Sequence, residues 1–171
     1  MTEDKHWYVS YVRSCREKIA AEKLAFHGYE YYLPVQRVVR QWSDRKKIVE
    51  RLVLPRMIFV HCTETERLRT LDLISDLYKY ITIKGPFTAS IISDVEMETF
   101  RTMVERGSRD VNIVGEHFSP GDKVRVVSGP LEGFECELLT VGGRRCLAVR
   151  LGFLGTATMD LDIDTIKKLE E

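Results

Sequence analysis

The chain has 171 residues, of which 44% are hydrophobic and 30% are charged, and its 26 basic residues balance its 26 acidic ones. This composition is typical of one or two folded domains, and the absence of a membrane-length apolar run or a signal-peptide core predicts a cytoplasmic protein without membrane contact. A net charge of zero argues against a protein that binds polyanions over its whole surface.

The first hundred residues alternate between strand and helix patterns. Aromatic and β-branched residues predict a strand over 7–13, and the capping-box pattern Ser14-x-x-Glu17 predicts a helix that ends at Gly28. The next predicted elements are a strand over 29–35, a β-hairpin over 36–53 with its tip at 43–46, a strand over 54–62, a short helix near 68–74, an extended stretch over 79–85, and a helix from Ser93 to Gly107. This order predicts an α+β domain over 6–107, with an antiparallel sheet and flanking helices.

The pattern changes near residue 118. Residues 108–117 have few strong signals and predict a linker. Beyond them the short apolar segments KVRVV, ECELLTV, CLAVRL and TATMDL are separated by glycine-containing turns. Several short strands in about 50 residues predict a small five-stranded β-barrel over 118–171.

Cysteines and histidines give no metal-site pattern, because the chain has no CxxC pair and no HxxxH spacing. We expect reduced cysteines, no metal and no cofactor. Cys15 leaves two alternatives: a thiol activated at a helix start, or a packed small side chain, which is the commoner case. Motifs of phosphate-binding, dinucleotide-binding and hydrolytic enzymes are also absent, so we expect no catalytic residue and no enzyme activity.

Residues 35–56 concentrate positive charge. Seven basic residues against two acidic ones give this segment a net charge of +5, and Trp42 lies near the predicted hairpin tip. Basic residues beside an aromatic ring are typical of contacts with phosphates and an exposed base. The predicted nucleic-acid contacts are Arg37, Arg40, Trp42, Arg45, Lys46, Lys47 and Arg51. The alternative is a solvated hairpin whose charges only maintain solubility.

The segment from 121 to 134, GDKVRVVSGPLEGF, resembles the KOW motif. The matching residues are Gly121, Asp122, Val124, Val126, Gly129, Pro130, Gly133 and Phe134. In physical terms, the two valines alternate into a core, and the glycine beside the proline suits a tight turn with positive φ. Cys136 stands where the motif has a further glycine.

The first domain resembles the N-terminal domain of the NusG family of transcription factors. The resemblance rests on Trp7-Tyr8-Val9, Glu22 and Leu24, Tyr32-Leu33-Pro34, and Leu54-Pro55-Arg56-Met57-Ile58-Phe59-Val60. Where the family has Pro-Gly-Tyr-x-Phe, this chain has arginine and methionine in the second and third places. The stretch YLPVQRVVRQWSDRKKIVE is similar to the UpxY branch, the specialised paralogues of capsular polysaccharide operons in Bacteroides-type bacteria.

The resemblance implies a monomeric elongation or antitermination factor that binds the clamp helices of the RNA polymerase largest subunit. Such a factor suppresses pausing or termination, and its KOW domain recruits Rho or a small-subunit ribosomal protein. The implied clamp-helix site is Val9, Tyr11, Pro55, Met57, Phe59, Met97 and Phe100. Strand alternation supports it by placing Val9 with Tyr11 and Met57 with Phe59 on shared faces. The alternative for all of these positions is ordinary core.

Two further sets of contacts follow from the resemblance alone. Arg13, Lys23 and His27 are expected to join the hairpin in facing non-template DNA or nascent RNA, and Arg69 and Thr70 are expected to reach the opposite pincer of the polymerase. A different class of function stays open, since KOW motifs also occur in RNA- or ribosome-associated proteins that do not contact polymerase.

Overall fold

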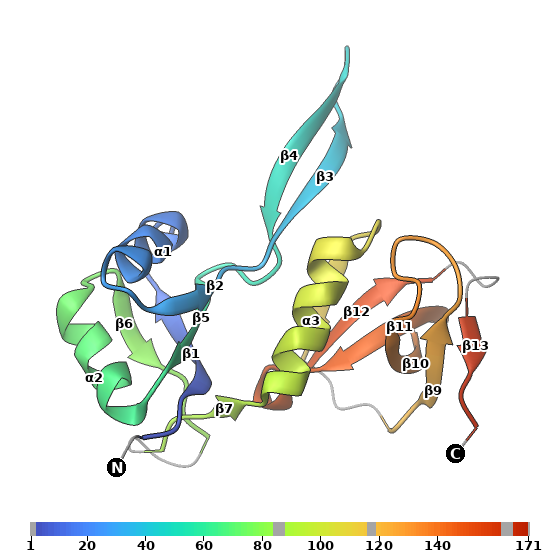
Figure 1. Ribbon diagram of the computed structural model, residues 1–171. Helices are drawn as coiled ribbons and strands as arrows, with labels where there is room; N and C mark the ends of the chain where they lie inside the picture. Colours follow the sequence, from blue (N-terminus) through green and yellow to red (C-terminus); the bar gives the residue numbers. More distant parts are fainter. Residues whose placement is uncertain (1–2, 84–87, 116–118, 162–165, 171) are drawn as a thin grey trace. The chain divides into compact units, whose positions relative to one another are not determined.

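The structure, a computed structural model, describes residues 3–83, 88–115, 119–161 and 166–170 (Figure 1). The chain divides into two compact units. One comprises residues 1–34 and 54–94, and the other comprises residues 35–53 and 95–171. The predicted mixture of helices and antiparallel sheets is confirmed, with three α-helices among the described residues.

The first unit is built on an antiparallel sheet in the order β2-β5-β1-β6, with β7 also paired to β1. Its strands are β1 (His6–Val12), β2 (Glu30–Tyr32), β5 (Met57–Cys62), β6 (Leu77–Tyr80) and β7 (Ile91–Ile92), and its helices are α1 (Glu17–Phe26) and α2 (Glu64–Leu73). Residues 84 and 85 of the predicted extended stretch lie outside the described residues. Alternation along the strands divides the sheet into two faces. Tyr8 and Ile58 face a core shared with Leu24 of α1, whereas Tyr11 and Met57 lie on the other face.

The predicted capping box at α1 is wrong. The helix begins at Glu17 after Arg16, with no side-chain cap, because the Glu17 carboxylate instead accepts a hydrogen bond from the backbone N–H of Arg56 at 2.9 Å. Cys15 is exposed with φ of 59°, so it is not a packed small side chain. A complete capping box does exist at α2, where Thr63 and Glu66 bond reciprocally, although this helix start was not predicted from the sequence.

The second unit contains the predicted hairpin, β3 (Val35–Gln41) with β4 (Lys46–Leu52), and the helix α3 (Asp94–Arg106). Its sheet has six strands in the order β13-β9-β10-β11-β12-β8. These are β8 (Val111–Val114), β9 (Asp122–Val126), β10 (Glu135–Val141), β11 (Arg144–Arg150), β12 (Thr156–Asp160) and β13 (Ile166–Lys168), with a 3₁₀ turn at Gly152–Leu154.

The described residues therefore form an open path of six strands and no closed barrel, which corrects the predicted five-stranded barrel. The extra strand is β8, which comes from the segment predicted to be a linker and pairs with β12. Residues 116 and 117 of that segment, and Phe118, lie outside the described residues. The alternation predicted for β9 is present, because Val124 and Val126 are buried. Gly129 has the expected positive φ, at 89°, and Gly133 also has a positive φ, at 84°.

Gly121 lies where β9 approaches β10 closely. A Cβ atom at this position would stand 2.3 Å from the carbonyl oxygen of Leu138 and 2.7 Å from Cδ2 of Leu139. Because backbone cannot retreat as a flexible side chain can, this position excludes any larger residue. At Gly115, by contrast, an added Cβ would meet no atom within 4 Å.

We expect Gly121→Ala to lower the free energy of unfolding by about 1–3 kcal/mol through overpacking. Gly115→Ala is the matched control, since it adds the same methyl group in open space. Chemical denaturation of the two full-length variants measures the difference. Equal stabilities would contradict the close approach of β9 and β10.

Candidate docking and nucleic-acid surfaces

A half-exposed aromatic patch lies on the face of the first sheet opposite α1. Tyr11 stands directly opposite Met57 on β5 and opposite Lys79 on β6. A register shift between β1 and β6 at Tyr11 brings Tyr78 to the same place, so that the two tyrosine rings stack with centroids 5.7 Å apart. Lys79 Nζ lies 5.4 Å from the centre of the Tyr11 ring. Bulges commonly redirect side chains in this way. We call Tyr11, Met57, Tyr78 and Lys79 the tyrosine patch.

The residues predicted for clamp-helix binding differ in exposure. Pro55 is exposed, and Tyr11 and Met57 are half-buried, so these three offer surface to a partner. Four others are almost completely buried: Val9, Phe59, Met97 and Phe100. Their side chains therefore offer no surface to a partner. Tyr78, which is 45% exposed, escaped the sequence analysis because a register shift leaves no periodic signal.

The two residues predicted to reach the opposite pincer of the polymerase also differ in exposure. Arg69 is exposed on α2. Thr70 is fully buried, and its hydroxyl lies 2.7 Å from the Tyr80 hydroxyl and donates to the Arg67 carbonyl. Only Arg69 of this pair therefore has a side chain available to a partner.

A group of cations surrounds the buried carboxylate of Asp76, just before β6. Lys23 Nζ is 2.6 Å from one carboxylate oxygen, and Arg16 Nε is 2.8 Å from the other. Arg13 Nε donates to the neighbouring Ser75 carbonyl. Lys23 and Arg16 hold the pKa of Asp76 below its usual value. Arg13, Lys23 and His27 were predicted to join the hairpin in contacting nucleic acid. Arg13 and Lys23 lie near each other around Ser75 and Asp76, whereas His27 is the exposed C-cap of α1.

The basic hairpin is formed by the antiparallel strands β3 and β4 (Figure 1), and its two faces carry different side chains. Strand alternation places Gln36, Val38 and Arg40 on one face with their partners on β4, and Trp42 continues that face at the turn. At its distal end Lys47 Nζ lies 5.1 Å above the Trp42 ring, so cation and aromatic ring form one surface.

The opposite face of the hairpin is different in character. It carries Arg37, Val39 and Gln41 opposite Glu50, Ile48 and Lys46. Its centre is apolar, because the cross-strand pair Val39 and Ile48 is 61% and 67% exposed. Arg45 lies in the turn and is exposed. Arg51 is half-buried at the hairpin base and donates to the Val111 carbonyl, so it is not available to a phosphate.

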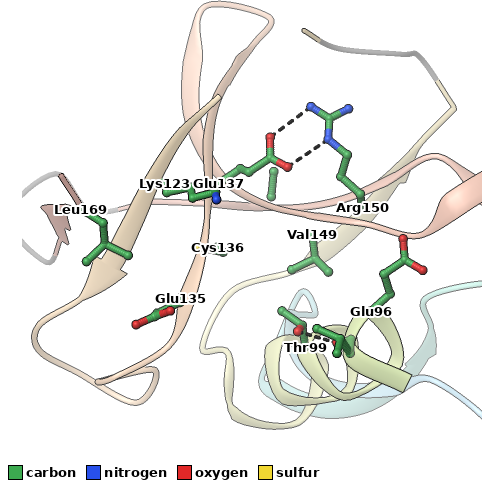
Figure 2. A pocket seen from close by; sticks show the side chains of 11 residues that line it. Glu96, Thr99, Lys123, Glu135, Cys136, Glu137, Val149, Arg150 and Leu169 are labelled. Carbon is green, nitrogen blue, oxygen red and sulfur yellow. Dashed lines mark hydrogen bonds and ion pairs between the residues drawn. The ribbon is translucent and has the colours of Figure 1, made fainter. Parts of the chain in front are cut away.

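A cavity of about 380 Å³ lies between α3 and the sheet of the second unit (Figure 2). Its residues are Val95, Glu96 and Thr99 of α3, Lys123, Glu135, Cys136, Glu137, Ala148, Val149 and Arg150 of the sheet, and Leu169. Arg150 forms an ion pair with Glu137 at 3.0 Å and holds its pKa low, while burial raises the pKa of the Cys136 thiol to about 12. The thiol is therefore protonated at neutral pH and is not a ready nucleophile.

In the part of the chain that the structure describes, no group of three or more histidine, cysteine or acidic side chains is placed to hold a metal ion. Among those same residues no helix is long and apolar enough to cross a membrane.

We expect Asp76→Asn to lower the free energy of unfolding at pH 7 by about 1 kcal/mol, because two charge-assisted hydrogen bonds weaken but both cations are partly solvated. The folded-state pKa of Asp76 is depressed, so its contribution is complete above the unfolded-state pKa and is lost as pH falls through the folded-state pKa. Urea unfolding at pH 7 and at acidic pH should therefore show the variant and wild type converging in acid. A difference that does not depend on pH would contradict this account.

Comparison with known proteins agrees with these observations. A family model described as transcription termination factor nusG matches residues 5–101. No curated protein matches the chain. A solved structure described as domain interaction in Thermotoga maritima NusG is similar over 98% of both chains, with 18% identity and a TM-score of 0.51, which shows the fold alone.

Two further solved chains, from conformations A and B of an MjSpt4:Spt5 complex, are 12% and 13% identical. Each covers 96% of this chain, and the matches span 99% and 97% of the solved chains, but TM-scores of 0.29 and 0.31 carry no argument about the fold. The nusG model, in contrast, matches more than half of this chain. The chain therefore belongs to the NusG family, whose members are non-enzymatic transcription factors that act with the transcription machinery.

Proposed function

We propose that this protein is an elongation and antitermination factor that binds the clamp helices of the RNA polymerase largest subunit and suppresses pausing or termination. The observation that carries this proposal is the tyrosine patch, a half-exposed group of two stacked tyrosines and a methionine on one sheet face. Aromatic and methionine side chains are favoured at protein interfaces, and methionine adapts to an apolar helix. Lys79, over the Tyr11 ring, adds a cation for an acidic residue on that helix.

The proposal includes an operon-specific role in polysaccharide biosynthesis, as the similarity to the UpxY branch implies. It also includes recruitment of Rho or a small-subunit ribosomal protein by the six-stranded sheet of the second unit. Arg69 of α2 is the proposed contact to the opposite pincer of the polymerase, because its side chain is exposed.

We expect Met57→Glu to weaken binding to purified Bacteroides-type RNA polymerase by about 30-fold or more, since a charge would be buried against an apolar helix. Tyr78→Ala should also weaken binding, because it removes the ring stacked on Tyr11. Surface-immobilised polymerase and a titration of the full-length protein give both dissociation constants. Circular dichroism checks that each variant stays folded.

Val127→Glu is the matched control, because Val127 is an apolar residue of the second unit that is already 44% exposed. It should leave polymerase affinity unchanged. Equal affinities for wild type and Met57→Glu would contradict the tyrosine patch as the docking site. Co-sedimentation with ribosomes and no binding to polymerase would favour a ribosome-associated protein instead.

The proposal assigns nucleic-acid contact to one face of the basic hairpin. Arg40, Trp42 and Lys47 lie together at its distal end, and Trp42 is 50% exposed. A ring beside two cations suits a base and its flanking phosphates on a single strand of non-template DNA or nascent RNA. Arg40 also approaches Asp110 at 3.5 Å, an exposed pair that weakly offsets its charge.

Two double variants, each of which removes two positive charges, distinguish nucleic-acid binding at one hairpin face from diffuse electrostatic attraction to the whole hairpin. We expect Arg40→Ala with Lys47→Ala to weaken binding of labelled single-stranded DNA or RNA and to reduce the logarithmic salt slope by about 1.4. Arg37→Ala with Lys46→Ala changes the opposite face and should have a much smaller effect. Equal losses in the two variants would show only diffuse electrostatic attraction. Fluorescence anisotropy at several salt concentrations measures both quantities.

A further inference from the structure

The tyrosine patch lies at one end of the ladder that joins β1 to β5. The ladder has its final pair at Tyr11 and Met57, and Met57 is the first residue of β5. The end of a strand opens more readily than its centre, because no further pair lies beyond it to fix the backbone. The position of the Met57 side chain therefore depends on the residue that precedes it, Arg56.

The backbone of Arg56 has a left-handed conformation, with φ of 63°. Residues with a Cβ atom are disfavoured there, because the Cβ comes too close to the following carbonyl oxygen. Two hydrogen bonds hold the conformation: the Arg56 N–H donates to Glu17 Oε1 at 2.9 Å, and the Arg56 carbonyl accepts from the Val12 N–H at 2.8 Å. The second bond comes from the backbone of β1, so the first is the contact that a single side chain controls.

Glu17 is the first residue of α1, yet its carboxylate bonds to a distant turn. An acidic residue in the first turn of a helix commonly stabilises the helix itself, through the helix dipole or a cap. Here the N-cap residue, Arg16, makes no side-chain cap bond, and the Glu17 carboxylate reaches Arg56, 39 residues along the chain. Glu17 is only 6% exposed, so a docked partner does not reach its side chain.

A second carboxylate makes the same kind of bond at the other end of β5. Glu66 Oε2 accepts from the Thr63 N–H at 2.9 Å, directly after β5 ends at Cys62. This bond belongs to the capping box of α2 and joins residues only three positions apart. The two ends of β5 are about 17 Å apart, since a strand rises roughly 3.3 Å per residue. Glu66 is therefore a matched comparison for Glu17, equal in bond type and length but far from Met57.

We propose that Glu17 is a positioning residue for polymerase binding: its carboxylate keeps Arg56 in the left-handed conformation and so places Met57 opposite Tyr11 in the tyrosine patch. Glu17 does not contact the polymerase, and its effect passes through the turn before β5. The inference rests on the proposed docking role of the tyrosine patch and adds the residue that sets its geometry. A glycine at position 56 would adopt positive φ without steric conflict, so the need for Glu17 follows from the arginine there.

The first experiment compares Glu17→Ala with Glu66→Ala in the full-length protein. Each variant removes one carboxylate that accepts a backbone N–H, so both should lose similar stability in urea. We expect Glu17→Ala to weaken binding to surface-immobilised polymerase by about fivefold or more, and Glu66→Ala to leave it unchanged. Glu17→Gln should retain most of the affinity, because its amide oxygen also accepts a hydrogen bond. Equal losses of affinity in the two alanine variants would overturn the positioning role.

The second experiment tests whether the conformation of Arg56 is the reason that Glu17 matters. Glu17→Ala is combined with Arg56→Gly, since glycine adopts positive φ freely. In this double-variant cycle, the affinity lost through Glu17→Ala should fall to about twofold or less when position 56 is glycine. An undiminished loss in the Arg56→Gly protein would show that Glu17 acts elsewhere. The Arg56→Gly background also keeps the measurement possible if Glu17→Ala by itself is unstable.

The third experiment observes the tyrosine patch without polymerase, so that failure of the positioning role and failure of the docking role give different results. In NMR spectra of protein with labelled methionine methyl groups, Glu17→Ala should shift the Met57 signal and Glu66→Ala should not. An unshifted Met57 signal would overturn the positioning role. If the signal shifts but neither Glu17→Ala nor Met57→Glu weakens polymerase binding, the docking role fails and the positioning of Met57 stands. If Met57→Glu weakens binding and Glu17→Ala does not, the docking role stands and Glu17 is not its positioning residue.

Discussion

The arrangement of the second unit depends on the hydrogen bonding of one buried amide, that of Gln36. A buried glutamine is costly unless both its donors and its acceptor are bonded, and this one bonds backbone groups at the end of α3 and the start of β8 as well as Arg51. A two-stranded hairpin has little stability by itself. Its base is therefore defined by a polar anchor, while its distal part stays exposed. Strand alternation places Val38 on the same face as Gln36, where it is buried, and the next residue, Val39, on the opposite face, where it is 61% exposed.

The parts predictable from sequence were those with a local physical signal. Aromatic and β-branched residues predicted β1, a short apolar run predicted β5, and apolar pairs on either side of a polar tip predicted the hairpin. The glycines at 129 and 133 stand in predicted turns, and both have positive φ. The predictions that failed concern features that depend on residues distant in the sequence. Ser14-x-x-Glu17 has the form of a capping box, but Glu17 bonds to Arg56, 39 residues away. Likewise, the position of Tyr78 follows from a register shift, and the pairing of β8 follows from the free edge of β12.

The net charge of the whole chain also does not predict where its charges lie. The chain is neutral overall, yet the segment 35–56 has a net charge of +5, and the residues from 121 onward have 7 basic against 9 acidic residues. Local attraction to an anion depends on cations within about one Debye length, roughly 10 Å at moderate salt, and not on the total. At Asp76 a buried carboxylate fixes Arg16 and Lys23 in place. A neutral total is thus compatible with defined basic surfaces, and it limits non-specific attraction elsewhere.

The turn before β5 illustrates how the tyrosine patch is held. Arg56 has φ of 63°, in the left-handed region that costs a non-glycine residue about 1–2 kcal/mol. Two backbone bonds hold this conformation: the Arg56 N–H donates to Glu17, and the Arg56 carbonyl accepts from Val12. Because Val12 ends β1 and Met57 begins β5, the bonds that hold Arg56 also align these two strands. Arg56 and Met57 are consecutive, so the position of Met57 in the tyrosine patch depends on Glu17 at the start of α1.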